Sequence, residues 1–404
     1  MADRRHFGKT VFRQRFAPLW PVSHAALYLV LFTCSARSHP QQAVSLSHFL
    51  PRREVLGEKF VGPGACASCH HQKSSSQPHT AMARALHNPA DSDVLRSHAR
   101  MTLQKGQYLY EIVRQGQQIL YRVTDGQQTI SEPVSYSFGN ARVAETYVLR
   151  HNGKLYEGRV SYYTAIDGLD WTIGDALSPP PSLEEAMGRD ISGDEARNCF
   201  SCHGTAAVAN TKLDLNGLIP GVTCEACHGP GQQHAVVMLS DVRAEPFIFN
   251  PKTLDPDRLS QEFCGACHRG VDTVAMMPDL GGISNVRFQP YRLYNSRGHD
   301  PKDARLACTA CHDPHSDLQK DAAAYDGKCT VCHPSLNAAR VRPGPQKKGG
   351  VVNPRPTEAA SKTCPVAKER CVGCHMPKVE LPGAHFKFTD HRIRIERSGE
   401  PYPF

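Results

Sequence analysis

The chain has 404 residues with a formal net charge of +8, and only 40% of the residues are apolar. Its 15 Phe, 13 Tyr and 2 Trp stand beside 31 Gly and 30 Pro, a thin supply of core-forming side chains and a rich supply of turns. This composition excludes a chain held together throughout by a protein-only core. The 16 cysteines indicate what else holds it together.

Residues 1–38 predict an export signal. Five basic residues precede a ten-residue apolar stretch, Ala25 to Cys34, which is too short to span a bilayer, and Ala36-Arg37-Ser38 offers a cleavage site. Three alternatives stay open: a twin-arginine signal at Arg4-Arg5, a lipid anchor on Cys34, and an uncleaved helical anchor. The expected location is periplasmic or otherwise extracytoplasmic, with membrane contact only through the N-terminus if it is uncleaved or lipidated.

Fourteen of the cysteines fall into seven copies of the pattern Cys-x-x-Cys-His. This pattern is typical of c-type haem attachment, because two thiols on one turn of backbone reach the vinyl groups of a porphyrin and the next residue becomes the proximal ligand of iron. The attachment cysteines are Cys66 and Cys69, Cys199 and Cys202, Cys224 and Cys227, Cys264 and Cys267, Cys308 and Cys311, Cys329 and Cys332, and Cys371 and Cys374. The proximal ligands are His70, His203, His228, His268, His312, His333 and His375. The sequence therefore predicts seven covalently bound haem c groups.

Two other interpretations of these cysteines are weaker. Structural zinc does not require a His after every second Cys, and seven half-sites cannot pair into four-ligand sites. A disulfide framework fails because residues i and i+3 of a tight turn seldom make good bridges. Cys364 lies outside the motifs and is expected to be a free thiol, with distal ligation of a haem as the alternative.

The spacing of the motifs divides the chain into an N-terminal single-haem segment at 39–100, an antiparallel β insertion at 101–180 and a six-haem region at 181–404. The strand signals within the insertion lie at 108–113, 119–123, 146–150 and 154–160, with turns at Asp125-Gly126 and Asn152-Gly153. Helices are expected at 194–209 and 260–269, and an exposed loop at 341–356. The predicted fold class is a multihaem cytochrome of mostly short α-helices and loops wrapped around seven haems, with a small antiparallel β insertion.

Ten histidines remain beyond the N-terminal region as candidates for the sixth position of each iron. His234 and His315 stand where a short turn after a motif aims an imidazole at a neighbouring haem rather than its own. His71 is poorly placed for the iron of the adjacent His70, and His151 lies at a predicted hairpin tip. Packing explains Met276 and Met277 better than ligation does.

Several stretches resemble the cytochrome c-552/4 (cytochrome c-554) family, specifically its multihaem proteins with doubled motifs. They are 60–70 leading to His79, 221–231 with His234, Cys308 to His315, and Cys371 to Lys378 followed by 388–393. The resemblance covers most of 58–395 apart from the β insertion. It implies His79, His234, His315 and His391 as distal ligands, with His299 as a further one. Some relatives leave one haem five-coordinate, so an open site is an alternative.

The predicted function is an electron-transfer relay between unidentified redox proteins, without nucleic acid and without a catalytic residue. Nucleic acid is not expected, because the propionates of seven haems would offset the positive charge. The alternative is an oxidoreductase with one five-coordinate haem acting on a small nitrogen or oxygen species, its candidate the haem of Cys264 and Cys267. All seven motifs end in His rather than Lys, which speaks against nitrite or tetrathionate reduction.

Overall fold

The computed structural model describes residues 49–55, 57, 59–174, 178–240, 245–277, 282–333, 364, 366–367, 369–397 and 399–403. The expected export signal with Cys34 and the expected loop at 341–356 lie outside these residues. The chain divides into two units, 1–42 and 43–404, and every described residue belongs to the second. Within this described part, no helix is both long enough and apolar enough to cross a membrane.

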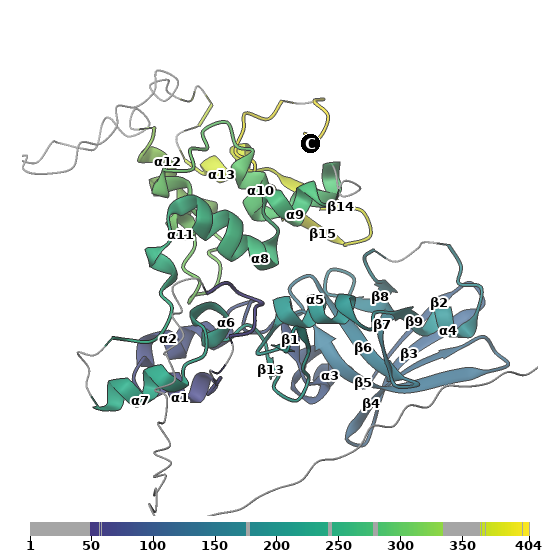
Figure 1. Cartoon of the computed structure of the whole chain (residues 1–404). Helices are drawn as coiled ribbons and strands as arrows, with labels where there is room; N and C mark the ends of the chain where they lie inside the picture. The colour runs from purple at the N-terminus through teal and green to yellow at the C-terminus, as the bar shows by residue number, and fades with distance from the viewer. Residues whose placement is uncertain are drawn as a thin grey trace, which may run out of the picture. The chain divides into compact units, whose positions relative to one another are not determined.

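A nine-stranded antiparallel sheet is the largest element (Figure 1). Seven strands follow one another in chain order: β2 (Arg100–Lys105), β3 (Tyr108–Gln115), β4 (Gln118–Thr124), β5 (Thr129–Phe138), β6 (Ala144–His151), β7 (Lys154–Tyr163) and β8 (Gly168–Trp171). Two short strands extend it, since β1 (Leu86–His87) pairs with β5 and β9 (Gly188–Asp190) pairs with β7. The sheet is nearly closed, because Lys105 at the end of β2 forms an ion pair with Asp170 of β8, with 3.0 Å between Nζ and Oδ1.

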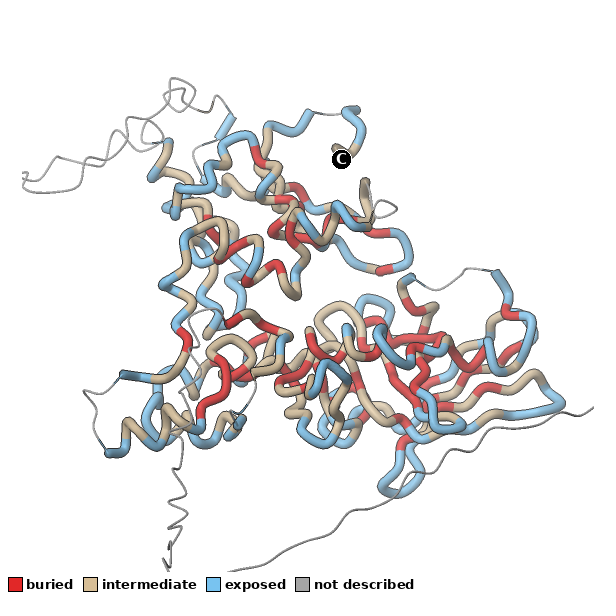
Figure 2. Tube along the Cα trace, in the orientation of Figure 1, coloured by how far each residue is buried: buried red, intermediate tan, exposed pale blue. Residues whose placement is uncertain are grey.

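Alternation of apolar and polar residues forms these strands and fills the space that the sheet encloses. Along β3, Tyr108, Tyr110 and Ile112 are buried while their neighbours are less so, and β4 follows the same rule. The inward residues join a core cluster that is continuous through the sheet and includes Val160 and Leu149 (Figure 2). The sheet therefore has a protein-only core of its own.

The predicted fold class is wrong in its proportions, because the β structure is not a small insertion among short helices. The strands expected from aromatic and β-branched runs are confirmed as β3, β4, β6 and β7, and the turn at Asn152-Gly153 joins β6 to β7 with positive φ at both residues. The strands that were missed have weak signals. Strand β5 contains Pro133 and alternates polar residues, β2 is mostly polar, and β1 and β9 have two and three residues. Their partners, rather than their own propensities, make them strands.

The remaining described segments are short helices and turns that carry the motifs. They include α1 (Pro63–Ala67), α2 (His71–Ser76), α5 (Asp194–His203), α6 (Cys224–His228), α7 (Gln232–Ser240), the π-turn η5 (Arg258–Cys264), α8 (Gly265–His268), α10 (Gln289–Tyr294), α11 (Cys308–Cys311), α12 (Asp326–Thr330) and α13 (Cys371–His375). A hairpin of β14 (Lys378–Leu381) and β15 (Phe386–Thr389) follows α13. The expected helix at 194–209 begins as predicted and ends at His203.

Helix α5 packs against the sheet. The Phe200 ring lies 4.9 Å from the ring of Tyr136 and 5.0 Å from that of Phe138, both in β5. The other motif-bearing segments have a thinner apolar core, a cluster whose buried members are Phe49, Phe249, Leu259 and Phe263. The second motif is thus anchored on the sheet, and the others depend on different contacts.

Candidate haem attachment sites

Each motif forms one turn of helix. The backbone N–H of His70 donates to the carbonyl of Cys66 at 2.9 Å, and His312 and His333 make the equivalent bond to the first cysteine of their motifs. Positions i, i+3 and i+4 of a helical turn share one face. The two thiols and the imidazole of each motif therefore lie on one side of the backbone, as covalent attachment of a planar macrocycle requires.

The fifteen described cysteines are free thiols, and those of different motifs lie against one another. The thiol contacts join Cys66 with Cys224, Cys202 with Cys267, Cys264 with Cys308, and Cys329 with Cys371. Hydrogen bonds from their neighbours lower the pKa of Cys224, Cys202 and Cys308 to about 7. The Cys227 and Cys311 thiols lie within electrostatic range of Cys264 and Cys329 respectively. The seven motifs thus form one contiguous series in the order first, third, fourth, fifth, sixth and seventh, with the second beside the fourth.

Three imidazole pairs face each other across a gap. The ring centroids of His70 and His234 are 6.2 Å apart with the planes at 19°. Those of His228 and His315 are 6.0 Å apart at 17°. The third pair joins His312 to His391 at 6.2 Å and 42°. In each pair a proximal histidine of one motif faces a histidine outside the motifs.

This separation fits an iron between the rings. A metal bound by two imidazole nitrogens at about 2 Å each, with each ring centre about 1 Å beyond its nitrogen, separates the ring centres by roughly 6 Å. The residues present therefore fit a haem with two axial histidines at the first, third and fifth motifs.

Hydrogen bonds at Nδ1 orient these rings. The Nδ1 atom of His234 lies 2.6 Å from the Pro246 carbonyl, and that of His391 lies 3.0 Å from the Thr389 carbonyl. The other such contacts are those of His203 with Ala85 O at 3.1 Å, His228 with Phe249 O at 2.9 Å, His375 with Arg394 O at 2.8 Å, and His315 with Asp313 Oδ1 at 3.1 Å. A ring that donates from Nδ1 presents a bare Nε2, the arrangement typical of metal-ligating histidine.

Three histidines that were not predicted as ligands have a partner at Nε2, and for His98 this comes in addition to an Nδ1 contact with the Val94 carbonyl at 2.9 Å. The Nε2 atom of His385 lies 2.9 Å from Asp170 Oδ2, and that of His98 lies 3.3 Å from Asp167 Oδ1. His151 is held at both nitrogens, by Glu132 and Asn152. These rings belong to ion pairs around the sheet, so their chemistry is accounted for without a metal.

Desolvation favours the neutral form of five of the candidate ligands. Desolvation lowers the pKa of His203, His228, His268 and His312, and lowers that of His391 to about 4. The imidazoles of His70, His234 and His315 add to this effect at His228, because all three lie close to it. Neutral imidazole is the form that binds iron.

Residues 180–229 match the family model described as cytochrome c554 and c-prime. This match supports a c-type cytochrome. It spans α5 and α6, and thus the second and third motifs, and it supports a haem-based electron-transfer role. No curated protein and no solved structure matches the chain.

In this candidate c-type cytochrome, the other predicted ligands are placed less distinctly. His79 ends the short helix η2 (Gln77–His79) and is exposed. His299 is mostly buried beside the Tyr294 ring, with its Nε2 4.0 Å from Asp257. Among the described residues, no three or more His, Cys, Asp or Glu side chains gather as a metal site. A haem supplies its own four equatorial nitrogens, so its protein ligands number at most two per iron.

Side chains that the sequence did not single out join neighbouring motifs. Glu225, between the cysteines of the third motif, accepts the backbone N–H groups of Val61 and Gly62 before the first motif, at 2.9 and 2.7 Å. It also accepts from Gly231 at 2.7 Å, at the start of the segment that leads to His234. In the sequence, the glutamate between the two cysteines of this motif could have indicated such a contact. It is buried in the structure, and a buried charge needs hydrogen-bond partners.

Other motif pairs are joined in the same way. Arg52 donates to Asn198 Oδ1 in α5 at 2.9 Å and to the carbonyl of Ala266 in α8 at 2.6 Å, so it ties the second motif to the fourth. Asp326 in α12 accepts from the backbone N–H of Cys371 at 2.9 Å and ties the sixth to the seventh. These polar contacts fix the motifs relative to one another where apolar packing is thin.

Proposed function

We propose that this chain is a periplasmic or otherwise extracytoplasmic seven-haem c-type cytochrome that relays electrons between redox proteins. The observation that carries the proposal is the contiguous series of seven attachment motifs, each adjoining the next through its cysteines. Haem groups bound there would supply one-electron chemistry. A relay needs such sites close together, so that electrons can pass from one to the next.

The residues of the chain perform three tasks in this proposal. The cysteines hold each group covalently, so that it is not lost between encounters. The hydrogen bonds at Nδ1 fix the rings of His234 and His391, which removes the cost of reorienting them. The paired imidazoles would both hold the iron and so would leave a substrate no place to bind at those three sites.

A second candidate function is an oxidoreductase with one open site, for which the fourth motif is the candidate because no His follows His268 until His299. The described ring contacts pair a second imidazole with His70, His228 and His312, and none with His268 or with the proximal histidines of the second, sixth and seventh motifs. A substrate of this kind would be a small nitrogen or oxygen species.

Haem content tests the attachment. Seven complete motifs predict seven haems per chain that survive acid-acetone extraction, counted by pyridine haemochrome spectra. Five or fewer would overturn the proposal. Expression without residues 1–38 should leave a haem-free, unfolded chain in the cytoplasm, because attachment takes place outside it, and a compact apoprotein by circular dichroism would contradict this.

Carbon monoxide separates the two candidate functions. A relay with filled axial positions should bind at most one equivalent per reduced chain, and His234→Ala should add one by exposing the position opposite His70. Full binding of one equivalent by the unmodified protein, together with turnover of nitrite, hydroxylamine or peroxide, would establish the oxidoreductase instead.

A further inference from the structure

A fully buried ion pair lies beside the His312–His391 pair. Arg292 of α10 and Asp390, the residue after β15, each have a completely buried side chain. Arg292 Nε lies 2.8 Å from Asp390 Oδ1, and Nη2 lies 2.8 Å from Oδ2, so the guanidinium and carboxylate meet through two parallel hydrogen bonds. Such bidentate geometry fixes the carboxylate in orientation as well as in position.

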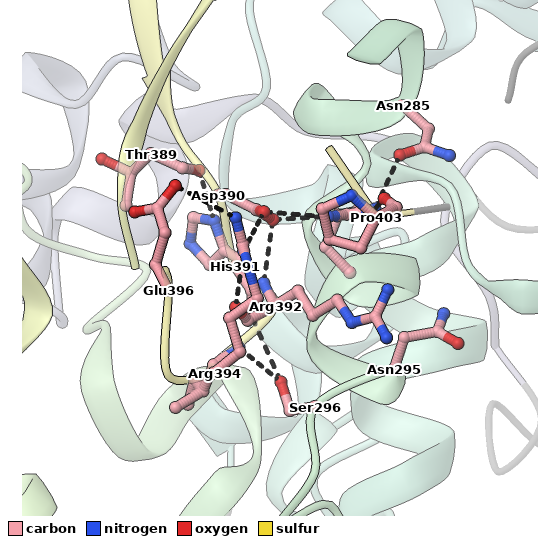
Figure 3. A network of polar contacts seen from close by, with 12 residues as sticks. Asn285, Asn295, Ser296, Thr389, Asp390, His391, Arg392, Arg394, Glu396 and Pro403 are labelled. Carbon is pink, nitrogen blue, oxygen red and sulfur yellow. Dashed lines mark hydrogen bonds and ion pairs between the residues drawn. The ribbon is translucent and has the colours of Figure 1, made fainter. Parts of the chain in front are cut away.

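The remaining polar atoms of the pair also have partners, and Figure 3 labels three of these, Asn285, Arg394 and Pro403. Arg292 Nη1 donates to Asn285 Oδ1 at 3.2 Å and to the Pro403 carbonyl at 2.9 Å. Asp390 accepts the backbone N–H of Arg392 at 3.0 Å and Nη1 of Arg394 at 2.5 Å. The guanidinium also lies 4.7 Å above the ring of Tyr402. Arg292 therefore forms hydrogen bonds with three separate segments, one before α10, one after β15 and one near the C-terminus.

Stability alone does not account for this arrangement. A buried ion pair loses hydration on folding, and its mutual attraction often does no more than offset that loss, so apolar residues of the same volume would serve as well. What an ion pair adds is a defined geometry. The residue whose geometry it defines most directly is His391, the next residue along the chain from Asp390.

The segment around His391 is otherwise held by single hydrogen bonds. The backbone N–H of Asp390 donates to the Pro377 carbonyl at 2.9 Å, and that of Ile393 donates to Ser296 Oγ at 2.8 Å. The His391 carbonyl accepts from Ser296 Oγ at 3.3 Å, and the ring is oriented by the carbonyl of Thr389, two residues earlier on the same segment. The same segment reaches the seventh motif, because the Arg394 carbonyl lies 2.8 Å from Nδ1 of His375. A shift of Asp390 would therefore move the contacts of two imidazoles.

We propose that Arg292 and Asp390 are positioning residues that hold the His391 imidazole opposite His312. The proposal rests on haem attachment at the fifth motif, which is part of the proposed function, and it adds which residues keep the sixth position of that site filled. Loss of the pair should leave the group attached through Cys308 and Cys311 and free the position that His391 fills.

The experiment compares variants of the full holoprotein by covalent haem count, ferric spin state and carbon monoxide binding after reduction. His391→Ala defines the complete effect, one additional equivalent of carbon monoxide. Asp390→Asn and Arg292→Met should each give a high-spin ferric signal and between about half and one additional equivalent, with the haem count unchanged. Arg292→Lys keeps the positive charge and loses the bidentate hydrogen bonding of the guanidinium. Its high-spin signal and its carbon monoxide binding should lie between those of these variants and those of the unmodified protein.

Two controls make the outcome decisive. Arg305→Ala removes a bidentate but only half-buried pair with Asp303, and it should leave the spin state and carbon monoxide binding unchanged. The double variant Arg292→Met/Asp390→Leu leaves no lone buried charge, so it should fold even where a single variant does not, and it should still bind the additional carbon monoxide. A low-spin double variant with unmodified carbon monoxide binding would overturn the positioning role. A low haem count in the unmodified protein would instead contradict the proposed function.

Discussion

The nine-stranded sheet and the motif-bearing segments are held together by different means. The sheet encloses a cluster of 18 buried residues, whereas the cluster among the motif-bearing segments around Phe249 has four. Large charged side chains are fully buried where the motifs lie, among them Arg292 and Asp390. The sheet is therefore a protein-only structure, whereas cross-chain polar contacts hold the motif-bearing segments, and the haems proposed to be attached there would supply the rest of their core.

Loss of one attachment site should have the largest effect, because it removes a cofactor and its share of the core. The double variant Cys224→Ala/Cys227→Ala is expected to carry six haems instead of seven and to lose the iron between His228 and His315. Mass spectrometry of the intact chain measures the first effect, and the loss of low-spin signal measures the second. Cys364→Ala is the matched control, since this cysteine lies outside the motifs, and it should keep all seven. Seven haems in the double variant would show that the third motif is not an attachment site.

Removal of a polar cross-link tests whether such contacts carry the motif-bearing segments. Glu225→Ala leaves the N–H groups of Val61, Gly62 and Gly231 without their acceptor. Each of these groups that stays buried costs about 1–3 kcal/mol of folding free energy. The expected loss is about 3–5 kcal/mol in free energy of unfolding, with a high-spin signal as His234 moves away from His70.

The control is Glu262→Ala, which removes an exposed i,i+4 pair with Arg258 and should cost less than about 0.5 kcal/mol. Equal stabilities of the two variants in denaturant titration would mean that the cofactors alone hold these segments.

A cavity made in the sheet core tests whether the sheet is independent of the motif-bearing segments. Leu149 of β6 is fully buried in the sheet core, and Leu149→Ala should cost about 2–4 kcal/mol through lost burial and the space left behind. Because the sheet core is made of protein alone, the haem count and spin states should not change. Exposed Ile166 provides the control, and Ile166→Ala should be nearly neutral. Haem loss in Leu149→Ala would show that the two regions share one core.

The same difference explains what the sequence could predict. Seven motifs are local patterns of five residues, so their positions and the chemistry of their thiols could be predicted from the sequence directly. Strands β3, β4, β6 and β7 were predicted because aromatic and β-branched runs mark them. Strand β5 was missed, because its pairing with β1, β4 and β6 makes up for a polar sequence that contains Pro133.

Contacts between residues far apart in the chain could not be predicted from the sequence. Glu225 and Gly62 are separated by 163 positions, and Arg292 and Asp390 by 98, so no local pattern relates them. The positions of His234 and His315 opposite other motifs follow an expectation from short turns, whereas His391 was named only through the family resemblance. The whole sheet was underestimated for a similar reason, since closure between β2 and β8 depends on residues far apart in the chain.

The smallest predicted effect concerns the one carboxyl group buried in the sheet. Burial raises the pKa of Glu145 to about 7, while the Ser92 hydroxyl at 2.6 Å and the hydroxyls of Ser137 and Tyr147 partly oppose this, and the charge of Asp93 adds to it. An unfolded glutamate titrates near its ordinary value of about 4.3. Between these values the folded state holds a proton that the unfolded state has released, so stability falls as pH rises from about 4.5 to about 7 and is level above that.

Glu145→Gln removes this proton and keeps the shape of the side chain. The variant should match the unmodified protein near pH 4.5 and exceed its stability by up to about 3 kcal/mol at pH 8, since the shift of about 2.5 pKa units corresponds to that energy. Amide hydrogen exchange of β5 and β6 at each pH reports on the sheet without the cofactors, and the ratio between the two proteins cancels the pH dependence of the exchange chemistry itself. A stability difference that is the same at pH 5 and pH 8 would show that Glu145 is charged in the folded sheet. The protein-only core would then tolerate a buried charge as the motif-bearing segments do.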